Sequence, residues 1–213
     1  MNATVATTVF SGVAVVWLLV TEARDSRWRR PAKMAASSGF IAVAIAAGAL
    51  GSGFGRLVVA GLALSWVGDL LLTLPAPMAF LGGLAAFLCG HVAYIAAFVV
   101  RGVGMAVVAI AAAIVALTAA LVWRWLSPHV SGVMRPAVVA YVIVISIMVI
   151  AAAGTTARHG DARVLLGAVA FFLSDLAVAG ERFVTPGFAN RAWGSPLYYF
   201  GQVLLALAAG ASG

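Results

Sequence analysis

Apolar residues occur along the chain in eight long runs separated by short polar or turn-forming segments. The runs cover residues 3–20, 34–50, 57–74, 78–100, 103–123, 136–153, 164–180 and 193–209. Each run approaches the roughly 20 residues that a helix needs to cross the hydrocarbon core of a bilayer. Breakers such as Arg29-Arg30-Pro31 and Pro75-Ala76-Pro77 stand between them. The pattern predicts an all-α, polytopic membrane protein with eight transmembrane helices in a single integral membrane domain, residues 1–213.

The composition also indicates a lipid environment. Hydrophobic residues make up 64% of the chain and charged residues only 9%, whereas soluble domains carry about 25% charged residues. So short a chain cannot hide that much apolar surface inside one globule. The formal charge of +7 comes from basic residues between the apolar runs. This distribution is typical of loops at a membrane surface, and we expect no nucleic-acid partner.

The basic residues predict an orientation in the membrane. Loops on the side of the N-terminus carry four: Arg56, Arg101, Arg158 and Arg163. Loops on the opposite side carry nine: Arg24, Arg27, Arg29, Arg30, Lys33, Arg124, Arg135, Arg182 and Arg191. Because cytoplasmic loops are enriched in Lys and Arg, the second side is predicted to be cytoplasmic, with both termini outside. The cluster 24–33 is interpreted as a topology signal that also contacts anionic lipid.

Two aspartates lie inside apolar runs at matching positions. Gly61 is followed by seven residues, Asp69 and a Leu, and Gly167 is followed by seven residues, Asp175 and a Leu, 106 residues further along. A charge in hydrocarbon costs at least about 2.5 kcal/mol, so two such residues indicate a functional site. Each lies roughly 8 Å from the cytoplasmic end of its helix, which places both at one depth. The offset suggests a possible parallel four-helix repeat.

Other polar residues occur on the same helices or their neighbours. Ser65 shares a helix face with Asp69, His91 and Tyr94 lie in the run 78–100, and Tyr198 and Gln202 are one turn apart in the last run. These positions predict a cavity among the third, fourth, seventh and eighth helices that opens toward the cytoplasmic side. No metal-binding motif is present, and no metal is expected.

Structural interpretations of the same residues stay open. The two aspartates could form a hydrogen-bonded clasp between helices, and His91 could bond a neighbouring helix. Tyr198 and Tyr199 could be interfacial aromatics, and Glu181 could form a surface ion pair with Arg182. A small proton-coupled transporter or channel would also use carboxyls in the membrane. A polar path through both faces would favour transport, and a cavity closed at the outer end would favour an enzyme.

Two carboxyls that share a poorly solvated site cannot both ionise cheaply, which leaves a protonated acid beside a carboxylate. This arrangement suits general acid catalysis through cationic intermediates, as in glycoside hydrolysis. An acid-labile vinyl ether in a lipid would be a matching substrate. An acid protonates the carbon remote from oxygen, and a carboxylate stabilises the resulting oxocarbenium ion and activates water.

Four short segments carry a family resemblance. They are Ser65-x-x-Gly68-Asp69, Gly90-His91-x-x-Tyr94, Phe172-x-Ser174-Asp175 and Tyr199-x-Gly201-Gln202. In order and spacing they resemble the bacterial YhhN-like family and its animal lysoplasmalogenase counterparts, over about residues 57–205. The resemblance implies a multi-pass enzyme, here in a bacterial inner (cell) membrane. Such an enzyme hydrolyses the vinyl ether bond of a lysoplasmalogen to a fatty aldehyde and a glycerophospho-alcohol. It also implies a lysophospholipid substrate drawn from membrane lipid and no metal or organic cofactor.

The same resemblance assigns roles to residues. The family's acidic pair maps onto Asp69 and Asp175, which we expect to be catalytic. The residues expected to orient the substrate, the water or the two carboxyls are Ser65, His91, Tyr94, Ser174, Tyr198, Tyr199, Gln202 and Glu181.

Overall fold

This computed structural model describes residues 2–210 of the chain. They form eight α-helices and four short helical segments, joined by turns and short loops. The α-helices are α1 (Ala3–Ala23), α2 (Arg29–Ala46), α3 (Gly53–Leu72), α4 (Pro77–Arg101), α5 (Val108–Leu126), α6 (Met134–His159), α7 (Ala162–Ala179) and α8 (Phe188–Gly210). The short segments are three 3-10 helices, η1 (Ala49–Gly51), η2 (Met105–Val107) and η3 (Ser127–His129), and one π-helix, η4 (Gly180–Val184). The all-α prediction is confirmed.

Several helices are longer than the apolar runs that predicted them. α2 begins at Arg29 instead of residue 34, α6 continues to His159 instead of 153, and α8 begins at Phe188 instead of 193. An apolar run marks the part of a helix in contact with hydrocarbon, whereas backbone hydrogen bonding continues into the polar turns at either end. The run therefore predicts that a helix exists better than it predicts where the helix ends.

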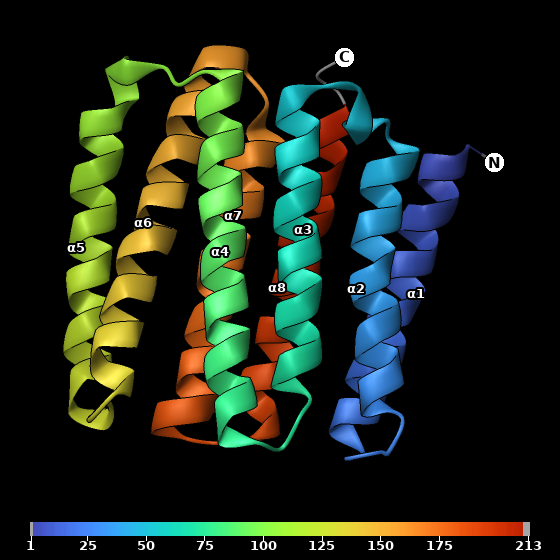
Figure 1. Ribbon diagram of the computed structural model, residues 1–213, viewed down its shortest axis with the longest axis vertical. Helices are drawn as coiled ribbons and strands as arrows, with labels where there is room; N and C mark the ends of the chain where they lie inside the picture. Colours follow the sequence, from blue (N-terminus) through green and yellow to red (C-terminus); the bar gives the residue numbers. More distant parts are fainter. Residues whose placement is uncertain (1, 211–213) are drawn as a thin grey trace.

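Six helical stretches of the described chain are long and apolar enough to cross a membrane: Ala3–Ala23, Gly53–Leu72, Met78–Arg101, Met105–His129, Met134–His159 and Ala162–Val184. α2 and α8 are not among them, although both lie lengthwise beside the other helices (Figure 1). α2 carries Lys33 and Ser37, and α8 carries Tyr198, Tyr199 and Gln202. The predicted count of eight membrane spans stays a prediction.

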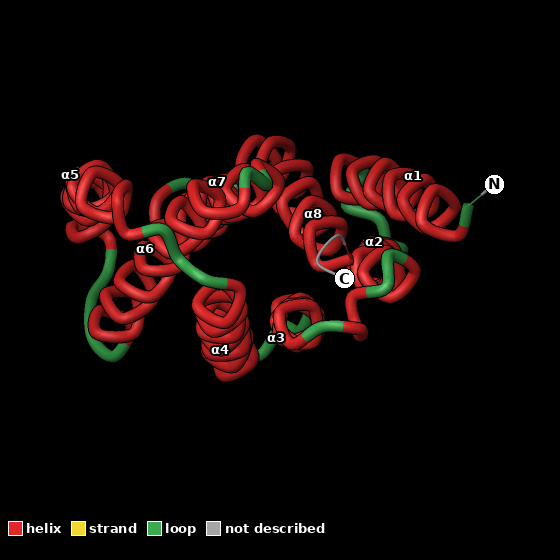
Figure 2. Tube along the Cα trace, turned by 90° about the horizontal axis from the view of Figure 1, so that it is seen from above, coloured by secondary structure: helices red, strands yellow, loops and turns green. Residues whose placement is uncertain are grey.

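The helices pack in an order that repeats between the two halves. α2 packs against α3, α3 against α4, and α4 against α6. In the second half α6 packs against α7, α7 against α8, and α8 against α2. The end-on view shows this ring of neighbours, with α5 outside it and beside α6 (Figure 2). These contacts are those that a duplicated four-helix unit would make, and the duplication itself stays a prediction.

The contact between α7 and α8 depends on two glycines that face each other. A Cβ atom added at Gly201 would lie 2.8 Å from the carbonyl oxygen of Gly167, and one added at Gly167 would lie 3.0 Å from that of Gly201. The first distance is shorter than real Cβ atoms show and the second is at the tight limit of their contacts, so the two backbones approach as closely as they do because neither residue has a side chain. Small residues allow this kind of approach between membrane helices. The contact places the polar residues of α8 beside α7.

A charged clasp joins α4, α6 and α7 at the end of the bundle where α1 begins (Figure 1). Asp161 follows Gly160, whose φ of 74° is the left-handed conformation that glycine adopts without steric cost. Its carboxylate accepts hydrogen bonds from Arg163 Nε at 2.8 Å and from both terminal nitrogens of Arg101 at 3.2 Å. Asp161 thus ties the turn between α6 and α7 to the end of α4.

Replacing Asp161 with Asn is expected to lower the free energy of unfolding by about 2 kcal/mol at neutral pH, because charge-assisted hydrogen bonds are lost. Burial raises the pKa of Asp161, but the hydrogen bonds and charges of Arg163 and Arg101 outweigh it and hold the pKa below the ordinary 3.8. The stabilisation is therefore fully present above about pH 4 and is lost as the pH falls through the lowered pKa. Thermal unfolding in detergent at pH 6 and at pH 3 should show the gap between wild type and variant closing with acid. A gap that stays constant would contradict the assignment.

Candidate active site

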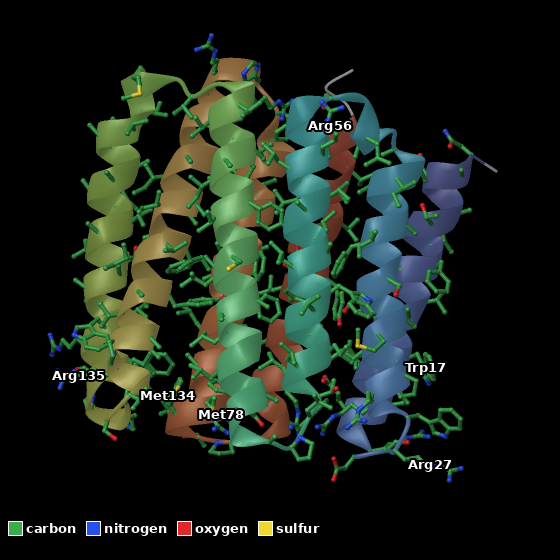
Figure 3. All side chains as sticks on the ribbon, in the orientation of Figure 1. Trp17, Arg27, Arg56, Met78, Met134 and Arg135 are labelled. Atoms are coloured by element: carbon green, nitrogen blue, oxygen red, sulfur yellow. The ribbon has the colours of Figure 1, made fainter. Side chains whose placement is uncertain are left out.

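One cavity of about 520 Å³ lies at the end of the bundle opposite the Asp161 clasp. Side chains from all eight α-helices and from η4 line it. Its mouth includes exposed residues, among them Arg182 and Pro186 in and beside η4. Figure 3 shows Arg27 and Arg135 at this end and Arg56 at the other. The sequence predicted a cavity among α3, α4, α7 and α8. The observed cavity is also lined by α1, α2, α5 and α6, and α2 and α6 supply partners of the aspartates.

Asp69 lies in a dense cluster on one wall of the cavity. Its side chain is 1% exposed, and Lys33 Nζ lies 3.1 Å from its Oδ1 atom. Ser37 Oγ and the Tyr198 hydroxyl donate hydrogen bonds to Oδ2 at 2.6 and 2.7 Å. The Tyr199 hydroxyl lies 3.1 Å from Ser37 Oγ. Lys33 and Ser37 are four residues apart on α2, so one helix face brings both to the carboxylate.

Asp175 has a different set of partners. The Tyr141 hydroxyl donates to its Oδ2 atom at 2.8 Å, and His91 Nε2 lies 3.3 Å from the same oxygen. His91 Nε2 is also 2.9 Å from the Tyr141 hydroxyl, so the three groups form a closed triangle. The Asp175 side chain is 17% exposed and that of His91 is fully buried. No Lys or Arg of the described chain forms an ion pair with Asp175.

The two aspartates line the same cavity, yet no hydrogen bond joins their carboxyls in the described residues. Aromatic rings connect the clusters. The ring of Phe171 is 5.3 Å from that of Tyr198 and 4.6 Å from that of His91, centre to centre. The sequence predicted two carboxyls at one depth that share a poorly solvated site. The structure places two separately bonded acids around one space.

The partners of the aspartates follow the same plan in each half. Asp69 on α3 receives a hydrogen bond from Ser37 on α2 and one from Tyr198 on α8. Asp175 on α7 contacts Tyr141 on the preceding helix, α6, and His91 on α4. α4 and α8 are the fourth helices of the two halves in the predicted repeat. Each aspartate therefore contacts one residue on the helix before its own and one residue on the fourth helix of the other half. The plan favours duplication of the acid cluster along with the helices.

The ten residues expected at the site divide into two groups. Six line the cavity: Asp69, Ser174, Asp175, Glu181, Tyr198 and Tyr199. Four are fully buried outside its lining: Ser65, His91, Tyr94 and Gln202. Among these, His91 reaches Asp175, and the Tyr94 hydroxyl donates to Gln202 Oε1 at 2.7 Å. The ring of Tyr94 occupies the space that the missing side chain of Gly61 leaves, because a Cβ there would lie 2.5 Å from it. Tyr94 and Gln202 therefore link α3, α4 and α8 beneath the cavity.

Ser174 and Glu181 make mainly local bonds. Ser174 Oγ donates to the carbonyl oxygen of Phe171 on its own helix at 2.7 Å. Glu181 accepts from the Gly187 amide at 2.7 Å and from Arg191 Nη1 at 3.1 Å. The alternative of an ion pair between Glu181 and Arg182 is not what forms: Glu181 pairs with Arg191, and the guanidinium of Arg182 lies over the ring of Phe80 at 4.3 Å.

Sequence reasoning missed four residues of the site: Glu22, Lys33, Ser37 and Tyr141. Lys33 was interpreted as part of a basic topology cluster, although its spacing of four from Ser37 indicates a shared helix face. Tyr141 stands alone among aliphatic residues, and only the packing of α6 against α4 and α7 shows its partners. Within the described residues, no group of three or more His, Cys, Asp or Glu is arranged to hold a metal ion.

Comparison with known sequences supports the resemblance. The model of the YhhN family matches residues 28–209, which is most of the chain. The chain belongs to the YhhN family. No curated protein and no solved structure matches it. The region shared with the YhhN family contains both aspartate clusters and starts after α1, so Glu22 lies outside it.

Proposed function

We propose that this YhhN family member is a membrane hydrolase that cleaves the vinyl ether bond of lysoplasmalogen-type lysolipids by carboxyl acid/base catalysis. The products would be a fatty aldehyde and a glycerophospho-alcohol. The observation that carries the proposal is a pair of differently bonded carboxyls around one cavity. Lys33 compensates the charge of Asp69 at 3.1 Å, whereas the polar partners of Asp175 among the described residues are Tyr141 and His91. Two acids in different environments can divide the roles of acid and base.

The division of roles follows from these partners. Asp175, in its protonated form, gives its proton to the vinyl carbon remote from the ether oxygen. Tyr141 then stabilises the carboxylate that remains, and so does His91. The oxocarbenium ion formed at the other vinyl carbon is stabilised by the Asp69 carboxylate and by the aromatic faces of Phe87 and Tyr198 in the cavity wall.

Addition of water completes the reaction. Asp69 accepts a proton from the water molecule as its oxygen bonds to the oxocarbenium carbon, which gives a hemiacetal. Asp175 then takes the hemiacetal hydroxyl proton while Asp69 returns its proton to the departing glycerol oxygen. The carbon–oxygen bond breaks, the aldehyde forms, and both aspartates regain their starting states. Overall one water molecule is consumed, and no redox partner is required.

The cavity is divided in a way that suits a lysolipid. Charged and hydroxyl side chains line the part next to α2, α3 and α8, where Lys33 and Asp69 lie. Aliphatic side chains line the part between α4, α5 and α6: Leu84, Val122, Leu126, Val138, Val142 and Ile145. A headgroup fits the first part and a hydrocarbon chain the second, with the ether between them. The lining does not reach the Asp161 clasp at the other end, which favours an enzyme over a transport path.

Purified protein in detergent, supplied with lysoplasmenylethanolamine, is expected to release fatty aldehyde. The matching lysolipid with a saturated ether should yield none, because it has no vinyl carbon to protonate. In deuterated water, the aldehyde should carry one deuterium on the carbon next to the carbonyl, as measured by mass spectrometry. A wild-type protein that releases no aldehyde from any vinyl ether lysolipid would refute the proposed reaction.

A further inference from the structure

The aliphatic part of the cavity is too shallow for the whole chain of a lysolipid. Its lining residues farthest from the mouth are Phe87 on α4, Ile145 on α6 and Phe172 on α7. Phe172 comes three residues before Asp175 on its helix, and Ile145 comes one turn after Tyr141, which bonds that acid. The cavity therefore ends only about 5 Å beyond the level of Asp175. A lipid chain spans about 15 Å, half of the hydrocarbon thickness of a bilayer, so most of it needs another place.

Packed side chains close the cavity beyond this level. Tyr94 and Phe98 follow Phe87 on α4, and Met148 follows Ile145 on α6. Tyr94, Phe98 and Met148 have no exposed surface and belong to the main core of the bundle. Interiors of this kind are packed as densely as organic crystals and leave no tunnel for a chain. The chain cannot continue along the axis of the bundle.

The aliphatic part of the cavity lies between two separate clusters of apolar side chains. Leu84 on α4 packs against the main core. Val142 on α6 packs instead against a smaller cluster where η3 joins α5 to α6. The buried members of this smaller cluster are Leu126, Val130 and Val138. Leu84 and Val142 line the same cavity, so the first half of α4 and the hairpin of α5 and α6 belong to different clusters on its two sides.

The space between these two clusters lies at the depth of the hydrocarbon. Leu84 and Val142 are roughly 10 and 12 Å from the start of their helices, inside the stretches Met78–Arg101 and Met134–His159 that are apolar enough to cross a membrane. Both side chains are only half-buried. α4 and α6 diverge toward the end where α5 joins α6 (Figure 1). The cavity can therefore be reached from the bilayer as well as through its charged mouth.

We infer that the substrate chain leaves the cavity through this lateral opening, between the first half of α4 and the hairpin of α5 and α6. Its outer carbons then stay in the bilayer while the ether lies at the aspartates. The inference rests on the proposed function and narrows its substrate to lysolipids whose chain length is not selected. The opening is continuous with the aliphatic part of the cavity, and an apolar chain that remains in hydrocarbon loses no burial on binding.

The test measures binding, with lysolipids that cannot react. Two saturated alkyl ether lysolipids share one headgroup and have chains of about six and about eighteen carbons, one near the depth of the closed space and one far longer than it. Their affinities for the purified protein are measured by calorimetry, relative to lipid in the detergent micelle. We expect the wild type to bind both within about threefold, because the extra carbons lie in hydrocarbon before and after binding. A wild type that rejects the longer chain, as a closed cavity would, overturns the inference.

Val142→Trp narrows the opening, and Ile143→Trp is its matched control. Ile143 is the next residue of α6, and its side chain is 54% exposed on the outside of the bundle. We expect Val142→Trp to weaken binding of the longer lipid about tenfold relative to the shorter one, because the new ring obstructs the path of the chain. Ile143→Trp should leave the ratio of the two affinities unchanged. Thermal unfolding in detergent tests whether each variant is folded.

Leu84→Trp narrows the opening from the side of α4 and should change the ratio in the same direction, so a single misfolded variant does not end the test. The inference is overturned if the folded Val142→Trp or Leu84→Trp variant weakens both lipids equally, or weakens neither. Because neither lipid has a vinyl ether, an absence of aldehyde release would refute the reaction without affecting this result.

Discussion

The Asp175→Asn variant is expected to release aldehyde at least about 100-fold more slowly than the wild type, while it stays folded. Proton transfer by a positioned side chain contributes about 100- to 10,000-fold to a rate, and Asn cannot protonate the vinyl carbon. The Asn amide still accepts a hydrogen bond from Tyr141, so the contact between α6 and α7 is retained. The measurement is the rate constant of aldehyde release under single-turnover conditions, and thermal unfolding tests whether the variant is folded.

Two further variants separate chemistry from packing at this position. Tyr141→Phe keeps the ring but removes the hydroxyl that stabilises the Asp175 carboxylate, and we expect a loss of about tenfold in kcat with little change in KM. Ser174→Ala is the matched control, since Ser174 lines the cavity one residue before Asp175 but its hydroxyl bonds its own helix. Its activity should equal that of the wild type within about twofold. A folded Asp175→Asn variant with full activity would show that Asp175 is not the acid.

The Lys33→Met variant is expected to lose about 3 kcal/mol of stability as well as activity. Removing one member of a buried ion pair leaves an uncompensated charge, which costs about 3 to 5 kcal/mol. Lys33 is only 21% exposed and Asp69 only 1%, so solvent can compensate little of the charge that remains. The measurement is thermal unfolding in detergent.

A double variant identifies the cause of this loss. Combining Lys33→Met with Asp69→Asn removes both charges, and we expect it to recover most of the lost stability while remaining inactive. Lys33→Arg keeps the charge and should retain much of the stability of the wild type. As a control, Arg24→Met removes an exposed basic residue of the same cluster 24–33, and it should change stability by less than about 0.5 kcal/mol. Equal losses for Lys33→Met in the presence and absence of Asp69 would contradict the pairing.

The features that sequence reasoning found are those that one helix shows by itself. A charge inside an apolar run is visible without any knowledge of packing, and for that reason Asp69 and Asp175 stood out. The depth of each acid follows from the helical rise, and both do line the cavity at the same end of the bundle. The helices were found for the same reason, since apolar runs of this length have few other uses.

The features that it missed depend on how the helices are rotated against each other. Lys33 reaches Asp69 because α2 packs between α3 and α8, a neighbourhood that no single run reveals. Tyr141 occurs in an aliphatic run and becomes informative only beside Asp175 and His91. Conversely, Tyr94 and Gln202 looked like cavity residues but bond to each other in the buried interior. Polarity inside a membrane helix thus indicates an internal partner, and only the packing decides whether that partner is a ligand or another side chain.

The loose attachment of α5 has a consequence for the fate of the two products. α5 packs chiefly against α6, and its outer side chains, such as Ile114 and Leu117, are more than half exposed toward the surrounding lipid. Its inner residues Val122 and Leu126 form one wall of the aliphatic part of the cavity. In the proposed reaction an oily aldehyde would then depart sideways past α5 into the bilayer, while the water-soluble glycerophospho-alcohol leaves through the charged mouth. Separate exits of this kind would let each product dissolve directly in its own phase.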